Sequence, residues 1–188
     1  LGALAAVGIF QAKRNLKLTE FDGIAREIFI AAQNHITMAS TMGLVDQSEN
    51  KGIFYEEKGS VLEHYYFIVS PGKRNTEEKG SVLELMLPFA SIDETVRNSG
   101  SYIIRYGYVR DGLTGSERSW VTDVFYSSGS GTDLGVTFTQ LDYDELFSDD
   151  IYRESTPDGK SARKNYNGNV IGYYGSSEGY TEKEDIIV

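Results

Sequence analysis

The first 42 residues contain no proline, and their only glycines are Gly2, Gly8 and Gly23, so no proline breaks a helix here. Within this segment, mainly apolar side chains recur every three or four residues, which is the spacing of one helix face. This stripe consists of Phe21, Ile24, Ala25, Ile28, Ala31, Ala32, His35 and Ile36. The pattern predicts one long amphipathic helix over residues 1–42, ended by Gly43, and a second layer that covers the stripe.

The remaining helix positions predict which side chains stay outside that second layer. Asp22, Arg26 and Gln33 lie largely away from the stripe and are predicted to face solvent. Phe29 and Ile30 also lie off the stripe, so we expect them to be available for contacts with other chains.

Residues 1–12 carry no charged side chain, and Lys13 and Arg14 then open a charged segment. About 20 apolar residues are needed to cross a bilayer, so we interpret this run as the remnant of a longer membrane anchor. A helix of about 42 residues is about 63 Å long, whereas a strand of five or six residues spans about 17–20 Å. One small sheet cannot cover such a helix. We therefore expect four anchor or assembly residues to project uncovered: Leu1, Leu4, Val7 and Phe10.

After Gly43 the sequence changes to short segments rich in β-branched and aromatic residues, bounded by glycine and serine. The predicted strands are Val61–Val69, Val82–Leu87, Tyr102–Val109, Trp120–Tyr126 and Asn169–Tyr174. A capping box at Ser91–Glu94 predicts a short helix to Asn98, and Asp142–Phe147 is a possible helical turn. Together these elements predict an α+β fold, in which a long N-terminal helix packs on an antiparallel β-sheet. Residues 43–175 form one domain with the helix in this prediction, and residues 176–188 form a polar tail or linker.

The octet EEKGSVLE occurs twice, at Glu56–Glu63 and at Glu77–Glu84, and each copy overlaps the start of a predicted strand. Two copies of eight residues do not make a repeat protein. We interpret the octet as a coincidence or a duplication within a hairpin.

Composition argues against several classes of function. The formal net charge is −10 and the sequence pI is about 4.7, so the surface repels nucleic acid. Cysteine is absent, and the two histidines are His35 and His64. The sequence has no Gly-x-Ser-x-Gly elbow, no phosphate-binding Walker loop and no His-Glu-x-x-His motif. We therefore expect neither an enzyme nor a cofactor.

One acidic cluster raises the question of a metal site. The weak candidates for calcium ligands are Asp142, Asp144, Asp149 and Asp150, with Glu145 among them. Calcium takes six to eight oxygen ligands, and the spacing here does not match an EF-hand loop. The pattern favours a solvated acidic loop over a calcium site, and we predict no metal.

Tyrosine is abundant, and several tyrosines lie near glycines: Tyr166, Tyr173, Tyr174 and Tyr180. Such side chains offer flat apolar area with a polar tip, which suits a sugar- or protein-binding face. The strand propensity of tyrosine explains most of them without a ligand.

The run AAVGIF followed by NLKLTEFDGIAREIFIAAQNHITMA resembles the first helix of type IV pilins and of pseudopilins of type II secretion systems. In that family an apolar half of the helix anchors the subunit, and an amphipathic half supports a sheet. The segments LPFASIDETVRNSGSYIIRYGYV, DVFYS, DYDELF and RKNYNGNVIGYYGS resemble a branch of prepilin-like proteins on bacterial surfaces. The prepilin cleavage motif of that family has no match here. If the chain is trimmed, the motif lies upstream of Leu1; if the chain is complete, the resemblance loses its best support.

The resemblance implies a pilin-like head and a structural, non-catalytic role in a type IV pilus-like or pseudopilus-like surface assembly. It implies partners in the form of other pilin-like subunits and the membrane, both contacted through the N-terminal helix. It also implies an extracellular location at the cell surface, membrane anchoring of the full-length protein and possible further β domains after Val188. The alternative is a membrane-anchored adhesin or ligand-binding module that uses the helix only as a tether and binds host or surface ligands.

Overall fold

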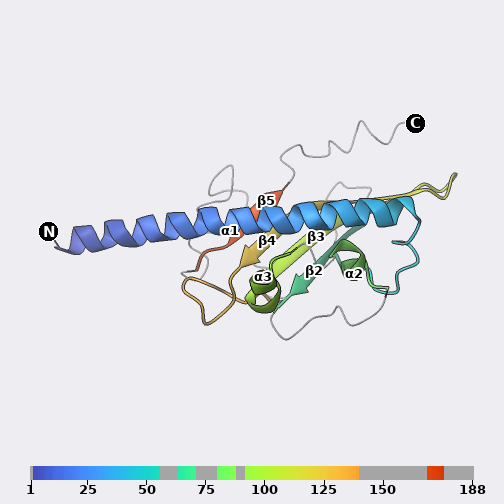
Figure 1. Ribbon diagram of the computed structural model, residues 1–188. Coiled ribbons are helices and arrows are strands. Elements are labelled where there is room, and N and C mark those ends of the chain that lie inside the picture. The colour runs from blue at the N-terminus through green and yellow to red at the C-terminus, as the bar shows by residue number, and fades with distance from the viewer. Residues whose placement is uncertain (1, 56–62, 71–79, 88–91, 140–168, 176–188) are drawn as a thin grey trace.

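The computed structural model describes residues 2–55, 63–70, 80–87, 92–139 and 169–175, with the side chains of the first helix described from Ala6 onward. In this part of the chain the fold is α+β, as predicted: a long N-terminal helix lies across one face of a five-stranded antiparallel sheet (Figure 1). The strand order is β1-β2-β3-β4-β5, so neighbouring strands are also consecutive along the chain. The helices are α1 (Gly2–Thr41), α2 (Val82–Met86) and α3 (Glu94–Ser99). The strands are β1 (Ile53–Tyr55), β2 (Glu63–Val69), β3 (Ser101–Arg110), β4 (Glu117–Ser127) and β5 (Gly172–Gly175).

The core lies between α1 and the sheet. On the helix, Phe21, Ile28, Ala32 and Ile36 are buried, whereas Ile24 is only partly buried at the margin of the interface. Their partners on the sheet include Tyr102, Ile104, Tyr106, Val121 and Val124. Each Å² of apolar surface removed from water here favours folding by about 25 cal/mol. Gly43 ends the helix in the left-handed conformation, with φ of 68°, as the sequence predicted.

Two polar residues of α1 that were predicted to face solvent instead bind the backbone of the sheet. The Val121 amide donates to Gln33 Oε1 at 2.7 Å, and the Tyr173 amide donates to Asp22 Oδ1 at 2.8 Å. Both side chains are half-buried, whereas Arg26 is exposed as expected. The prediction was wrong for Asp22 and Gln33 because helical spacing gives a residue's angular position but not the unpaired backbone groups opposite it.

The Gln33 contact lies at a bulge in β4. Arg105 pairs with Asp123 but Tyr106 pairs with Val121, so Thr122 is an extra residue in β4. The bulge brings Val121 and Val124, which are three residues apart, onto the same face of the sheet against α1. The Asp22 contact holds β5 against α1 in a similar way. A Cβ added at Gly172, the first residue of β5, would lie 2.2 Å from the carbonyl carbon of Phe21. Glycine is needed there for the strand to approach the helix.

Segment 82–87, predicted as a strand, is helix α2 over Val82–Met86. Ser81 Oγ accepts from the Glu84 amide, and Glu84 Oε2 accepts from the Gly80 amide, which satisfies two donors at the start of the helix. Val82, Leu83 and Met86 are buried. The apolar content of this segment indicated burial, but the Ser-x-x-Glu pair before it was the better guide to secondary structure.

Other predicted elements differ from the structure mainly at their ends. Strands β2, β3 and β4 occupy the predicted segments, whereas β5 begins three residues later than predicted, at Gly172. Helix α3 is capped by Asp93, whose Oδ1 accepts from the Thr95 amide at 2.8 Å. Ser91 and Asp142–Phe147 lie outside the described residues. Strand β1 was not predicted.

A matched pair of isoleucines on α1 tests the core. Ile28 is 0% exposed and Ile30 is 43% exposed. We expect Ile28→Ala to lower the free energy of unfolding by about 2–5 kcal/mol, because it removes buried methyl groups and leaves a cavity. Ile30→Ala should change it by about 0.5 kcal/mol or less. Urea unfolding of both variants measures the difference, and equal losses would contradict the assignment of the buried face.

Candidate functional site

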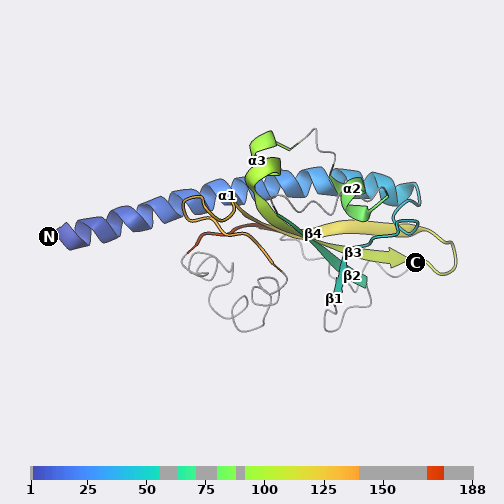
Figure 2. The same ribbon diagram turned by 90° about the horizontal axis from the view of Figure 1, so that it is seen from below.

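The first candidate surface is the N-terminal part of α1, which projects beyond the sheet (Figures 1 and 2). Val7, Ile9 and Phe10 are exposed there, with Ile9 71% exposed. Of the other two predicted anchor residues, Leu1 and the side chain of Leu4 lie outside the described residues. In the described residues no helix has an apolar stretch that would cross a membrane. These apolar side chains are left exposed by the described part of the fold.

Basic side chains mark the point where α1 meets the rest of the fold. Arg14 is 9% exposed, and its Nη2 donates to the carbonyl oxygen of Asn169 at 3.4 Å. Lys13 Nζ forms an ion pair with Asp133 Oδ2 at 2.5 Å. From Leu18 onward most side chains of the apolar stripe are buried, whereas Ile24 and His35 are half-buried. The helix therefore has an anchored part and a projecting part, and the boundary lies at residues 13–18.

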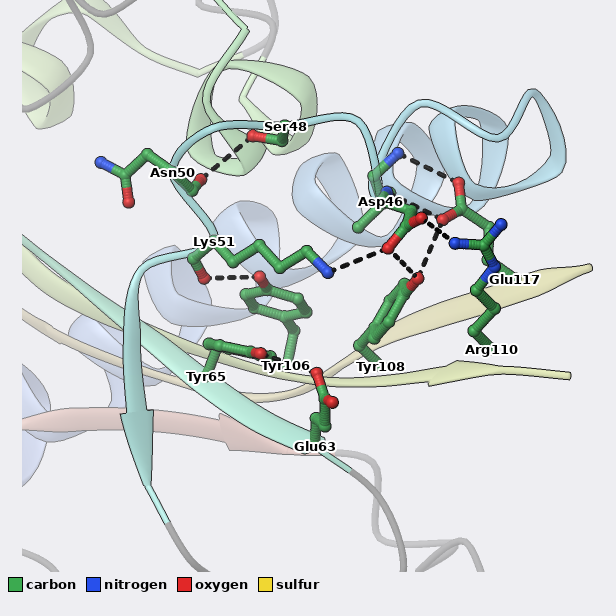
Figure 3. Close-up of polar contacts among 11 residues, drawn as sticks. Asp46, Ser48, Asn50, Lys51, Glu63, Tyr65, Tyr106, Tyr108, Arg110 and Glu117 are labelled. Atoms are coloured by element: carbon green, nitrogen blue, oxygen red, sulfur yellow. Dashed lines mark hydrogen bonds and ion pairs between the residues drawn. The ribbon is translucent and has the colours of Figure 1, made fainter. Parts of the chain in front are cut away.

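The second candidate is a polar cluster at the other end of α1 (Figure 3). Glu117, at the start of β4, is buried, and its carboxylate accepts from the amides of Val45 at 3.1 Å and Asp46 at 2.8 Å. Ser40 Oγ donates to the Glu117 carbonyl oxygen at 2.9 Å. One residue of the sheet thus fixes both the last turn of the helix and the segment after it.

Asp46 extends this cluster. Its Oδ1 accepts from the Tyr108 hydroxyl at 2.9 Å and from Lys51 Nζ at 3.2 Å, and its Oδ2 pairs with Arg110 (Figure 3). The hydrogen bonds from Tyr108 and Lys51 hold the pKa of Asp46 below its usual value. Burial and the hydrogen bond to Asp46 raise the pKa of Tyr108. Both carboxylate oxygens of Asp46 are engaged within the fold, so the cluster acts as a tether between segments of the chain.

Aromatic side chains form a third feature, on strands β1, β2 and β3. The Tyr65 and Tyr106 rings stack with centroids 5.5 Å apart, and Phe54 meets Tyr65 edge-on at 5.8 Å. Tyr65 donates to Glu63 Oε2 at 2.7 Å, and burial together with this bond raises the pKa of Tyr65 to about 12. Ile53 and Phe54 are exposed at this edge of the sheet.

Among the described residues, the tyrosines considered as a binding face do not lie together. Tyr173 packs on Phe125 in one core cluster, whereas Tyr174 contacts Phe29 beside the other. The sheet therefore separates these two tyrosines, and Tyr166 and Tyr180 lie outside the described residues. Phe29 was predicted to be available to other chains, but the Tyr174 contact partly buries it.

Among the described residues, the histidines and carboxylates likewise do not form a common site. His64 is buried, with Nδ1 3.4 Å from the Tyr55 hydroxyl, and His35 is half-buried on α1. In the ranges that the structure describes, no three His, Asp or Glu side chains gather as metal ligands. The calcium candidates Asp142, Asp144, Asp149 and Asp150 lie outside those ranges, so the prediction about them stays a prediction.

Sequence reasoning missed the cluster around Glu117 and Asp46. These residues are 71 positions apart, and neither belongs to a motif. Comparison with known proteins finds no matching family model, no matching curated protein and no matching solved structure.

The polar cluster predicts a pH dependence of stability. A carboxyl group whose pKa is lowered by folding stabilises the protein fully above its unfolded pKa, near 3.8, and this contribution is lost as pH falls through the folded pKa. The free energy of unfolding of the wild type should therefore drop more than that of Asp46→Asn between about pH 6 and about pH 2. Tyr108→Phe, which removes a hydrogen bond to Asp46, should also flatten the profile. Parallel pH profiles for all three proteins would rule out this role.

Proposed function

We propose that this chain is a structural, non-catalytic subunit of a type IV pilus-like or pseudopilus-like assembly at the bacterial cell surface. The observation that carries the proposal is the projecting end of α1, with Val7, Ile9 and Phe10 exposed. Apolar side chains on a projecting helix gain free energy when they are removed from water. In the proposed assembly they meet the helices of other subunits, or the membrane before assembly.

The remaining features are consistent with such a subunit. The part of α1 from Leu18 onward packs against the core, so the projecting end is continuous with a helix that the fold holds in place. The net charge of −10 disfavours nucleic acid as a partner. On this proposal the protein is extracellular, is anchored through its N-terminal helix and needs no cofactor.

A second candidate function is supported by the edge of the sheet. Ile53 and Phe54 are exposed on β1, next to the Tyr65 ring. An exposed aromatic side chain beside a hydrogen-bonded tyrosine suits the binding of a flat ligand or an extended peptide. A membrane-anchored adhesin would use this edge for its ligand and α1 only as a tether.

Deleting residues 1–12 tests the first proposal. The melting temperature should stay nearly unchanged, because the exposed side chains of Val7, Ile9 and Phe10 contribute little to the core. Self-association, measured by sedimentation velocity over a concentration series, should fall. The variant Phe54→Ser serves as the control and should associate like the wild type, since its substitution lies on the edge invoked by the second candidate. Unfolding on deletion, or unchanged self-association, would refute the assembly role of the helix.

A further inference from the structure

The outer face of α1, which forms an outer layer of the head (Figure 1), carries exposed residues at intervals of seven positions. Ile9, Leu16 and Ile30 are 71%, 73% and 43% exposed, and Gly23, which is also exposed, lies midway between the last two. Seven residues fall about 20° short of two full turns, so these four positions form one slowly winding line along the helix. None of them belongs to the buried stripe, so this line is not used by the core.

Gly23 is the member of this line that its own fold does not explain. A Cβ added there would have no heavy atom within 4 Å, and its φ is not positive. Glycine inside a helix lowers stability relative to alanine, because it loses more backbone entropy on folding. On the surface of a helix, glycine also lets the backbone of another helix approach closely. Gly23 therefore favours a helix as the partner of this face.

The charges beside Gly23 indicate which helix that partner is. At about 100° per residue, Arg26 lies about 60° to one side of Gly23 and Glu27 about 40° to the other. Both side chains are exposed. Among the residues that the structure describes, neither forms an ion pair within its own chain, although Arg26 lies over the Tyr174 ring at 5.9 Å.

This arrangement is complementary to a second copy of itself. When two copies of α1 cross in parallel at Gly23, the Arg26 flank of each helix faces the Glu27 flank of the other. Two ion pairs can then form across the contact. An antiparallel crossing would instead bring each flank against the same flank of its partner. The charges therefore favour a parallel pair of identical helices.

The net charge of the helix also favours contact through α1. The helix carries four basic and three acidic side chains, whereas the whole chain has a formal net charge of −10. Two copies therefore repel each other least where they meet through α1. Most of the exposed large apolar side chains of the described residues also lie on this helix. Their removal from water would favour the contact.

We propose that α1 of one copy packs in parallel against α1 of a second copy, with the two helices crossing at Gly23. Leu16 and Ile30 then each meet their counterparts on either side of the crossing, at an angle of about 20° between the helices. The inference rests on the proposed function and deepens it, because it assigns a contact between subunits to the part of α1 that packs on the sheet. A parallel pair also leaves both projecting ends on the same side, where both can reach one membrane.

The variant Gly23→Leu separates close approach of two helices from general apolar attraction. It should raise the melting temperature of the dilute protein by about 1–4 °C, because leucine is the better helix former and its own fold leaves room for it. It should also weaken self-association about ten-fold or more in sedimentation equilibrium, because the added side chains hold the helices apart. General apolar attraction would give the opposite result.

Gly8→Leu is the matched control. Gly8 is an exposed glycine of the same helix with no heavy atom within 4 Å of an added Cβ, and it lies about 22 Å from the crossing. This variant should associate at least as tightly as the wild type. Unchanged or tighter association of Gly23→Leu, or a wild type that stays monomeric over the concentration series, overturns the inference.

A charge exchange tests the orientation of the pair. Arg26→Glu and Glu27→Arg should each weaken self-association several-fold, because each places like charges across the contact. The double variant exchanges the two charges and should restore much of the association. If the double variant associates no better than either single variant, the parallel pairing is wrong.

Cysteine cross-linking tests the same orientation directly, because the chain contains no cysteine. In a parallel pair, Leu16→Cys places the two introduced thiols opposite each other, so mild oxidation should give a covalent dimer on a non-reducing gel. Asn15→Cys is the control, since Asn15 is exposed but lies about 100° around the helix from Leu16. Equal dimer yields from the two variants would contradict the proposed contact.

The outcomes also separate this contact from the proposed function. If Leu16→Cys gives no dimer while deletion of residues 1–12 still reduces self-association, the contact at Gly23 fails and the proposed function stands. If the Gly23→Leu and Leu16→Cys results are as expected but the deletion has no effect, the contact stands and the projecting end does not drive assembly.

Discussion

The packing of α1 against strands β4 and β5 organises the rest of the molecule. Ile28 and Ala32 share one buried cluster with Val121 and Val124, and the bulge in β4 places these two valines on the same face of the sheet. The bulge needs a partner for its displaced amide, and Gln33 supplies it. Burial of apolar surface and satisfaction of backbone donors thus occur at the same interface, so neither can be changed without the other.

The two ends of α1 differ in how far the rest of the fold contacts them. At its C-terminal end, Glu117 and Asp46 tie the helix, the following segment and the β3–β4 hairpin into one network. At its N-terminal end the helix passes Arg14 and then leaves the sheet with Ile9 and Phe10 exposed. The proposed assembly role depends on this combination of a packed head and an exposed apolar extension.

The candidate surfaces were only partly predictable from the sequence. The projecting end followed from a length argument, since a helix of about 42 residues exceeds the reach of a small sheet. The Glu117–Asp46 cluster could not be inferred, because its members come from separate elements and follow no spacing rule. Asp22 and Gln33 show the same limit. Their helical positions were correct, but their partners are strand amides 151 and 88 residues away, respectively.

The octet EEKGSVLE separates what the sequence determines from what tertiary structure decides. Local pattern alone specified the extent of α1, its stop at Gly43 and the strands β2 to β4, because these segments are long and strongly periodic. The octet is short, and its two copies end differently: Glu63 begins strand β2, whereas Glu84 lies inside helix α2. Identical residues have identical propensities, so the difference comes from the neighbours. Glu63 pairs with Tyr108 on β3, whereas Val82 and Leu83 are buried in the core that α1 and the sheet complete.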